Sequence, residues 1–294
     1  MINFEIFNKK IGLSLSGGGI KSYAQQPIIE YLYAKKIKFS YFAGTSMGSV
    51  VATLLAQGLN AEDLKKSLIR LEKNFMDRKI ITPKITSIAK NNHNGFLEGE
   101  KLEKLLEEEF ALHGITHIEN LKSSLFVVAV DLITSQLVIF TSCKTFKSKN
   151  PNVKVITTGK LSQIVRASCS IPVLLPSVDI DDMRLVDGGL LMAMPVTPII
   201  DAGAKKVISI SMLSDPTKST YDSIMEVGLR SLDMIIDASI YIEKGKSNLN
   251  INIPLGDITI IDVGKSSQVF EISKQWLIDN SVELNKQLKE KEIL

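Results

Sequence analysis

A serine between two glycines is the sharpest chemical signal in the sequence. Gly44-Thr45-Ser46-Met47-Gly48 separates an apolar run that predicts a strand, 39–43, from a small-residue run that predicts a helix, 47–57. Glycines two positions either side of a serine permit a strained strand-to-helix turn and leave room for substrate over the hydroxyl. The pattern therefore predicts a nucleophilic Ser46 at a helix N-terminus, where free N–H groups favour developing negative charge. The simpler interpretation is a packing turn in which Ser46 caps the helix.

Three consecutive glycines form a second candidate site. Gly17, Gly18 and Gly19 follow a predicted buried strand, 11–15, and can direct several backbone N–H groups to one point, which suits an anion or an oxyanion. The dinucleotide-binding fingerprint needs a glycine where Ser22 stands and an acidic residue at the end of the next strand. The phosphate-loop spacing is also absent. An oxyanion hole is therefore the favoured use of this loop.

A serine nucleophile needs a base, and histidine is scarce in this chain. The histidines are His93, His113 and His117, and none follows them, whereas α/β-hydrolases place the histidine last. His113 and His117 have the spacing of a metal pair, but Gly114 and the lack of a nearby third ligand favour surface positions. The alternative base is a carboxylate. Asp187-Gly188-Gly189 is the best candidate, because its glycines permit a turn that brings Asp187 close to the serine.

The remaining sequence predicts elements that would position these residues. Strands are expected at 11–15, 39–43, 124–130, 136–140, 207–212 and 258–263, and helices at 20–35, 47–57, 61–75, 98–110, 160–168, 221–246 and 267–291. Continuous apolar strands that alternate with helices predict an α/β fold with a mostly parallel central sheet covered by helices on both faces. We expect a single domain over 1–294, with a lid or surface loop at about 74–97.

Composition excludes several classes of protein. The chain has 294 residues, of which 45% are hydrophobic and 23% charged, as in globular proteins. Its net charge of +3 is too small to indicate a nucleic-acid partner. The start of the chain lacks a signal-peptide pattern, and Cys143 and Cys169 are interpreted as reduced thiols, so we expect a cytoplasmic protein. The uncharged run 39–61 is long enough to span a bilayer, but its polar small residues favour a strand followed by a buried helix.

In their order along the chain, these motifs resemble those of the bacterial patatin-like phospholipase family. Four segments carry the resemblance: Gly17-Gly18-Gly19-Ile20-Lys21-Ser22 is similar to the family's oxyanion motif, Gly44-Thr45-Ser46-Met47-Gly48 to its nucleophile elbow, Arg166-Ala167-Ser168-Cys169-Ser170-Ile171-Pro172 to its Ala-Ser-x-x-x-Pro segment, and Leu185-Val186-Asp187-Gly188-Gly189 to its Asp-Gly-Gly motif. Weaker similarity at 95–99 and in the closing elements extends the resemblance over nearly the whole chain. The family usually has Arg and Gly where Lys21 and Ser22 stand.

The resemblance implies a three-layer patatin-like α/β fold and a Ser-Asp dyad without histidine. Ser46 would attack an ester carbonyl and form an acyl-enzyme, and Asp187 would serve as the base. The N–H groups of Gly18 and Gly19 would hold the oxyanion, with Gly17 setting the loop. The implied supporting residues are Lys21, Gly44, Gly48, Gly188 and Gly189. The implied mechanism needs no metal and no other cofactor.

The implied function is that of a serine acyl hydrolase, of phospholipase A or lysophospholipase type, which cleaves acyl esters of phospholipids or lysophospholipids. Such a substrate implies peripheral contact with the inner membrane surface, and isoleucines interleaved with lysines at 79–90 are a candidate docking segment. The resemblance implies no oligomeric state. Two alternatives stay open. One is an acyl-ester or thioester hydrolase on soluble substrates, and the other is a non-catalytic lipid-binding or regulatory protein of the same fold.

Overall fold

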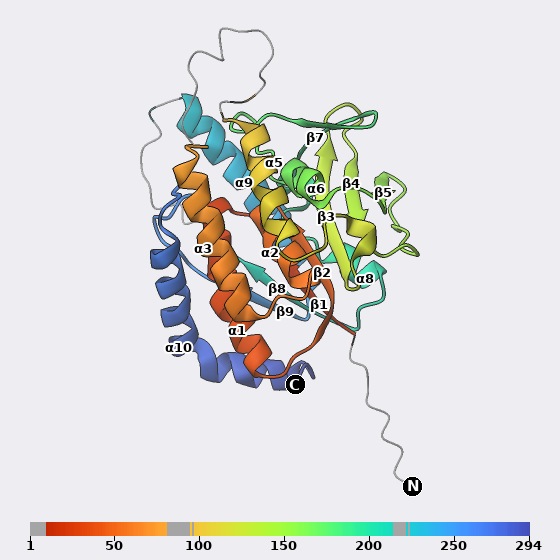
Figure 1. Cartoon of the computed structure of the whole chain (residues 1–294). Coiled ribbons are helices and arrows are strands. Elements are labelled where there is room, and N and C mark those ends of the chain that lie inside the picture. Colours follow the sequence, from red (N-terminus) through yellow and green to blue (C-terminus); the bar gives the residue numbers. More distant parts are fainter. Residues whose placement is uncertain (1–9, 81–94, 96, 214–221, 223) are drawn as a thin grey trace.

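One β-sheet forms the centre of the protein. The computed structural model describes residues 10–80, 95, 97–213, 222 and 224–294 (Figure 1). Within them, neighbouring strands follow one another across the sheet in this order: β5 (Val153–Ile156), β4 (Leu137–Thr141), β3 (Ser124–Asp131), β2 (Phe39–Thr45), β1 (Ile11–Leu15), β8 (Lys206–Ser211) and β9 (Leu249–Asn252). Two further strands lie off this path: β7 (Met183–Asp187) pairs with β3, and β6 (Val178–Ile180) pairs with β7. The pairs β3–β4, β3–β7 and β6–β7 are antiparallel and the other neighbours are parallel, which confirms the predicted mostly parallel sheet.

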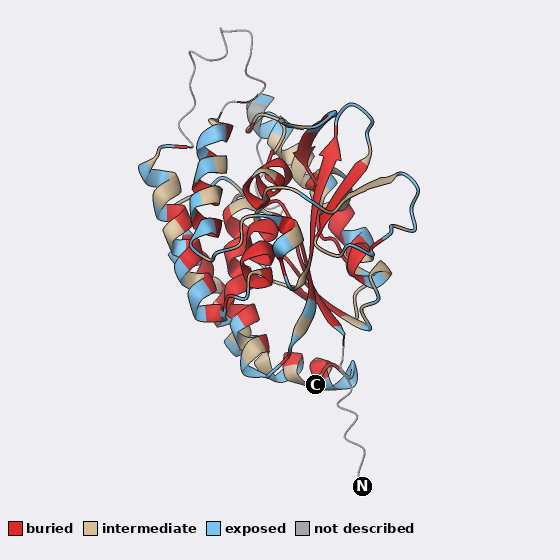
Figure 2. Cartoon of the chain, turned by 45° about the vertical axis from the view of Figure 1, so that its right-hand side comes forward, coloured by how far each residue is buried: buried red, intermediate tan, exposed pale blue. Residues whose placement is uncertain are grey.

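Helices cover both faces of this sheet. The first face carries η1 (Gly19–Ala24), α1 (Gln25–Ala34), α2 (Met47–Ala56), α3 (Ala61–Asp77), α5 (Gly99–Ala111) and α6 (Leu161–Ser168), with α10 (Ser266–Glu290) packed outside α1 and η1. The second face carries α7 (Gly189–Met192), α8 (Thr197–Asp201) and α9 (Ile224–Lys244). A short turn, η2 (Ile118–Asn120), leads into β3. Figure 2 shows the buried residues concentrated on the strands and on the inward faces of the helices.

The central strands β2, β3 and β4 read as largely apolar runs because they are buried on both faces of the sheet. Along β3, Leu125, Val127 and Ala129 belong to the core beneath the first helical layer, and Phe126, Val128 and Val130 to the core beneath the second. Successive side chains of a strand point to opposite faces of the sheet. A strand between two helical layers is therefore apolar at every position, as observed here.

Two predicted elements differ in the structure. The expected strand at 258–263 is wrong, because this segment forms turns and the last strand is β9, Leu249–Asn252, beside β8. Ile258 is buried, and Ile260 accepts a backbone hydrogen bond from Ile20. The segment is thus apolar because it packs against the glycine loop. The expected helix at 20–35 begins instead as the 3-10 turn η1, which starts at Gly19; both Gly18 and Gly19 have positive φ.

The expected lid at about 74–97 overlaps the end of α3, which continues to Asp77. Ile80 is fully buried, and Gly95 pairs with Val173. Residues 81–94 and 96 lie outside the described residues. The uncharged run 39–61 forms β2, α2 and the connection to α3, as the sequence predicts. No helix within the described ranges combines the length and apolar composition needed to cross a bilayer.

Candidate active site

Ser46 occupies a strained turn between β2 and α2. Its φ of 53° and ψ of −134° are rare for a residue with a side chain, and such strain is typical of functional positions. A Cβ at Gly44 would lie 2.2 Å from the Gly48 carbonyl oxygen, and one at Gly48 would lie 2.5 Å from that of Ser16. Both glycines are thus required by close backbone packing. The Ser46 side chain makes no capping bond to α2, so the helix-cap interpretation is wrong.

Asp187 reaches Ser46 because β2 and β7 meet end to end along β3. Thr45, the last residue of β2, pairs with Val128, and Asp187, the last residue of β7, pairs with Ala129. The opposite side of β3 is occupied by β4 at these positions. The two strands therefore run toward each other on one side of β3, and the Ser46 side chain lies close enough to the Asp187 carboxyl to lower its pKa.

The Asp187 carboxyl is buried, and its surroundings tune its acidity. Burial raises the pKa of Asp187 to about 6, while the hydrogen bonds from Ser46 and from the Gly189 N–H, 2.8 Å from Oδ1, act to lower it. A carboxyl with this pKa is ionised near neutrality and is a stronger base than an exposed aspartate. Gly188 is required by packing, because a Cβ there would lie 2.4 Å from the Val128 carbonyl oxygen.

The glycine loop passes directly against the serine. A Cβ at Gly17 would lie 2.9 Å from the Ser46 Cβ, and the Gly17 N–H donates to the Ala193 carbonyl at 3.0 Å. The hydrogen bonds recorded among the described residues leave the N–H groups of Gly18 and Gly19 without an acceptor. Gly17 thus anchors the loop, and the next two N–H groups are the donors available to an oxyanion.

Lys21, which also belongs to this loop, is buried where the loop meets helix α9. Burial lowers the pKa of Lys21, and the nearby Asp233 and Asp237 carboxylates raise it, in opposition to Arg230. The charge of Lys21 therefore interacts with the charged side chains of α9. Ser22, the other departure from the family pattern, directs its hydroxyl at the Ser16 carbonyl oxygen, 3.4 Å away.

Two serines that the sequence did not assign a role connect the site to the sheet. Ser168 Oγ accepts the Ser46 N–H at 2.9 Å and donates to the Val128 carbonyl at 2.7 Å. The Ser170 carbonyl accepts the Asp187 N–H at 2.9 Å. The C-terminal end of α6 and the residues directly after it therefore hold both Ser46 and Asp187 in place. The similarity of this segment to the Ala-Ser-x-x-x-Pro motif was the only sequence signal for this role.

A buried arginine holds the same segment from the other side. The Arg166 guanidinium donates to the carbonyl oxygens of Gly99 and Pro176, each at 2.9 Å, and to the Ser170 hydroxyl at 2.5 Å. Burial lowers the pKa of Arg166 to about 10, which leaves it charged at neutral pH. Gly99 cannot carry a side chain, because its Cβ would lie 1.9 Å from a guanidinium nitrogen. This clamp fixes the connection from α6 to β6, including the turn that faces Ser46.

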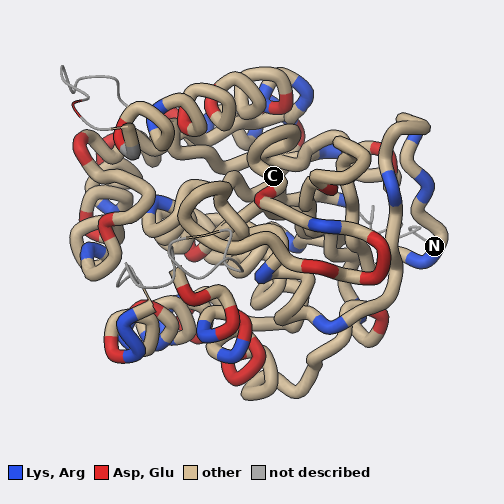
Figure 3. Tube along the Cα trace, turned by 90° about the horizontal axis from the view of Figure 1, so that it is seen from above, with Lys and Arg blue, Asp and Glu red and all other residues tan. Residues whose placement is uncertain are grey.

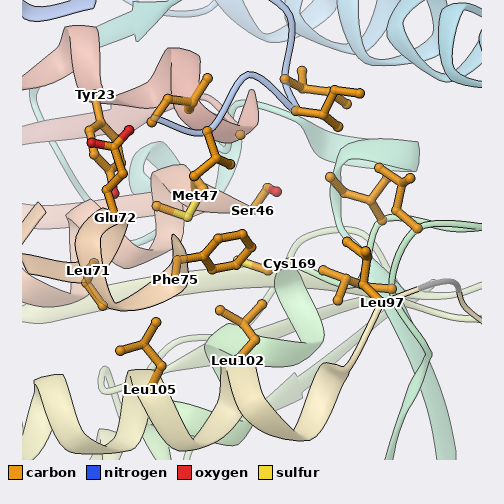
Figure 4. Close-up of a pocket in the computed structure, with 18 residues that line it drawn as sticks. Tyr23, Ser46, Met47, Leu71, Glu72, Phe75, Leu97, Leu102, Leu105 and Cys169 are labelled. Atoms are coloured by element: carbon orange, nitrogen blue, oxygen red, sulfur yellow. The ribbon is translucent and has the colours of Figure 1, made fainter. Parts of the chain in front are cut away.

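An apolar pocket opens on Ser46. Its cavity measures about 120 Å³. Figure 4 shows Leu71 and Phe75 of α3, Leu102 and Leu105 of α5, Leu97, Met47 and Cys169 around the space in front of the serine. The carboxylate of Glu72 in the wall is already engaged, because it accepts the Gly264 and Ser266 N–H groups at 2.8 and 3.0 Å. Burial raises the pKa of the Cys169 thiol, which therefore stays protonated.

The described histidines lie apart from this site. His113 contacts Ser67 and Glu109 on the helices α3 and α5, each at 3.3 Å, and His117 contacts Thr116. His93 lies outside the described residues. The described part of the chain contains no group of three histidine, cysteine, aspartate or glutamate side chains arranged to hold a metal ion. The cysteines Cys143 and Cys169 are both free thiols.

A three-layer α/β fold that presents a serine on a strained strand-to-helix turn, beside a buried carboxyl, places the chain in the class of proteins with a nucleophile elbow. A family model described as patatin-like phospholipase matches residues 13–200. The chain belongs to this family.

Relatives and solved structures agree with this assignment. An uncharacterized NTE family protein of Mycobacterium tuberculosis is 27% identical over 207 residues, which cover 70% of this chain and 31% of that protein. Lysophospholipase NTE1 of Scheffersomyces stipitis is 26% identical over 223 residues, covering 73% and 12%. The chain thus spans about a third of the first of these proteins and less of the second. The complex of ExoU with SpcU from Pseudomonas aeruginosa shares the fold, with a TM-score of 0.51, 16% identity, and coverage of 96% of this chain and 52% of that one.

Proposed function

We propose that this protein is a serine acyl hydrolase that cleaves acyl esters of phospholipids or lysophospholipids through Ser46 and Asp187. The observation that carries the proposal is the approach of the Ser46 side chain to the buried Asp187 carboxyl, beside an apolar pocket that Ser46 lines. Strain at Ser46 and burial of Asp187 each cost folding free energy and are typical of functional residues. Their coincidence at one contact supports a catalytic dyad more strongly than either motif alone.

The proposed reaction proceeds in two halves. Ser46 Oγ attacks the ester carbonyl carbon as Asp187 takes its proton, and the N–H groups of Gly18 and Gly19 donate to the oxyanion. The tetrahedral intermediate collapses to an acyl-enzyme, and the leaving alkoxide takes the proton from Asp187. A water molecule then gives a proton to Asp187 and attacks the acyl carbonyl carbon. Collapse releases the fatty acid and returns the proton to Ser46.

The pocket supports a lipid acyl group as the substrate portion that is bound. Its walls include leucine, isoleucine, phenylalanine and methionine side chains from α2, α3, α5 and the turn that follows α6. An acyl chain placed there would exchange water for apolar contacts along its length. The named activity of the lysophospholipase relative agrees with this class of substrate. A hydrolase of soluble acyl esters or thioesters would use the same dyad without needing an extended apolar wall.

Lipid product analysis tests the proposal. Wild type and Ser46→Ala are incubated with a phosphatidylcholine and with its lyso form, and released fatty acid is measured by mass spectrometry. We expect release by wild type and none by Ser46→Ala. Ser162→Ala is the matched control, because its buried hydroxyl has no recorded partner among the described residues. Equal release by wild type and Ser46→Ala would overturn the proposal.

Two further measurements separate the alternatives. A serine-directed phosphonate should label Ser46, and failure to do so would favour a non-catalytic lipid-binding protein. Wild type should hydrolyse a micellar ester faster than the same ester below its micellar concentration. A preference for the monomeric ester would favour the hydrolase of soluble substrates.

A further inference from the structure

Helix α9, Ile224–Lys244, connects the site to the protein surface. On its inner side Ser239 Oγ accepts the Ala193 N–H at 2.9 Å, and Glu243 accepts the Thr197 N–H at 2.8 Å. Ile236 packs against Gly189 in the turn after Asp187, where a Cβ would lie 3.3 Å from its side chain. Asp233 faces Lys21 of the glycine loop. The inner side of α9 therefore contacts both segments that flank Ser46.

The outer side of α9 is apolar and uncovered. Six large side chains, between 45% and 95% exposed, form what we call the α9 stripe: Ile224, Val227, Met234, Ile235, Tyr241 and Ile242. Positions 227, 234 and 241 repeat every seven residues, with 235 and 242 beside them, so the side chains share one face of the helix. An exposed stripe of this length on a globular protein marks an interaction site.

The charges of α9 are distributed unequally between its two sides. Asp233 and Asp237 lie by Lys21, and Glu243 is buried in its bonds to Thr197 and Lys246. From Met234 onward the acidic side chains of the helix are thus directed inward. Lys244 remains outside, 3.8 Å from the centre of the Tyr241 ring. Elsewhere both signs of charge are interleaved over the outer helices, as Figure 3 shows from above.

We propose that the α9 stripe docks on the surface of a phospholipid bilayer, an inference that rests on the proposed lipid substrate. Apolar side chains would enter the acyl boundary, and Tyr241 and Lys244 would lie at the headgroups, where such residues are favoured. Because the inner side of the same helix contacts the glycine loop and the Asp187 turn, docking would place the bilayer about one helix diameter, roughly 10 Å, from these two segments.

A second copy of the chain fits the α9 stripe less well than a bilayer does. Two helices that pair through a seven-residue repeat place large apolar residues at two positions of each repeat. On α9 one of these positions carries Val227, Met234 and Tyr241, but the other carries Ile224, Ser231 and Ala238. The alternative docking segment predicted at 79–90 begins with a buried Ile80 and otherwise lies outside the described residues.

Vesicle sedimentation tests the proposal independently of catalysis. All proteins carry Ser46→Ala, so lipid turnover does not alter the vesicles. Binding to vesicles of phosphatidylcholine with phosphatidylglycerol is compared for this background and for Val227→Ser with Met234→Ser. Each substitution removes one buried apolar side chain from the bilayer, so we expect the partition coefficient to fall at least about tenfold. Thermal unfolding verifies that the variant folds.

The matched control changes two apolar residues on another helix that are even more exposed, Ile278→Ser with Val282→Ser on α10, and should bind like the background. Equal loss in both pairs, or no loss in the α9 pair, would overturn the proposal. Analytical ultracentrifugation tests whether a second copy of the chain binds the α9 stripe instead. A dimer that the α9 substitutions dissociate, together with absence of vesicle binding, would assign the stripe to a second copy instead.

Discussion

Ser46 and Asp187 meet because the strands that carry them end on neighbouring residues of a third strand. Thr45 pairs with Val128, and Asp187 pairs with Ala129, from opposite directions. The approach of these two residues is thus set by the register of β3 rather than by a loop. Since a one-residue slip in register would reverse the facing of every side chain, the position of the dyad is strongly specified by the buried core on both faces of β3.

The first prediction concerns pH. If Asp187 is the base, only its ionised form is active, and burial raises its pKa to about 6. We expect kcat/KM for a monomeric ester to rise about tenfold per pH unit below this pKa and to level above it. A rate that stays constant through this range, or that rises only above neutrality, would assign the proton transfer to another group.

The second prediction is that Asp187→Asn stabilises the protein while abolishing hydrolysis. The pKa of Asp187 is raised from 3.8 to about 6 on folding. The folded state therefore holds the proton more tightly, and the free energy of unfolding falls as pH rises through this interval, by about 3 kcal/mol in total. Asparagine carries no charge to desolvate, so the variant should gain up to about this amount near neutrality, where the carboxyl is ionised.

Urea unfolding of both proteins at neutral pH and below the unfolded-state pKa measures this effect. The difference between the variant and wild type should shrink at acid pH, where Asp187 is protonated in both states. A variant that is less stable than wild type at neutral pH would contradict the assigned burial penalty.

The third prediction distinguishes the effect of a steric clash in the glycine loop from the effect of backbone strain alone. Gly19 has a φ of +54°, and a Cβ there would lie 2.0 Å from the Ile260 carbonyl oxygen. Gly19→Ala must therefore shift the loop and misdirect its N–H groups, and we expect kcat to fall about a hundredfold. Gly256 has a similar φ of +58° but open space around it. Gly256→Ala should lose stability through strain alone and keep its kcat. Equal kcat in the two variants would remove Gly19 from the oxyanion hole.

The sequence predicted the parts of the fold that are set by local periodicity. Helices such as α5 and α10 were found within about one residue of their ends, since apolar spacing and helix length are visible in the chain. The strand β9 was missed because Asn250 and Asn252 alternate with its apolar residues and hydrogen-bond to Ser211 of β8. Their polarity is satisfied only by a neighbour that is distant in sequence.

The residues of the site also fall into two groups, those that the sequence marked and those that it did not. Gly44, Gly48 and Gly188 were visible because each lies where a side chain would collide with backbone, and a glycine at such a position marks the turn in the sequence itself. Ser168 and Arg166 act through contacts with β2, β3 and α5. A serine or an arginine on a helix is common, so only the similarity of their segment to the family's Ala-Ser-x-x-x-Pro motif distinguished these two.

The last prediction tests whether the chemistry needs histidine. His113 contacts Ser67 and Glu109, and His117 contacts Thr116, so neither described histidine touches the dyad. A triple variant, His93→Gln with His113→Gln and His117→Gln, should keep kcat within about twofold of wild type, because the proposed Ser46–Asp187 mechanism uses no histidine. The change at His113 removes a partner of Glu109, which Arg70 continues to satisfy, so the loss of stability should stay below about 1 kcal/mol. Steady-state kinetics on a monomeric ester decides the question. A loss of kcat of a hundredfold or more in a folded triple variant would replace the dyad with a histidine-dependent mechanism.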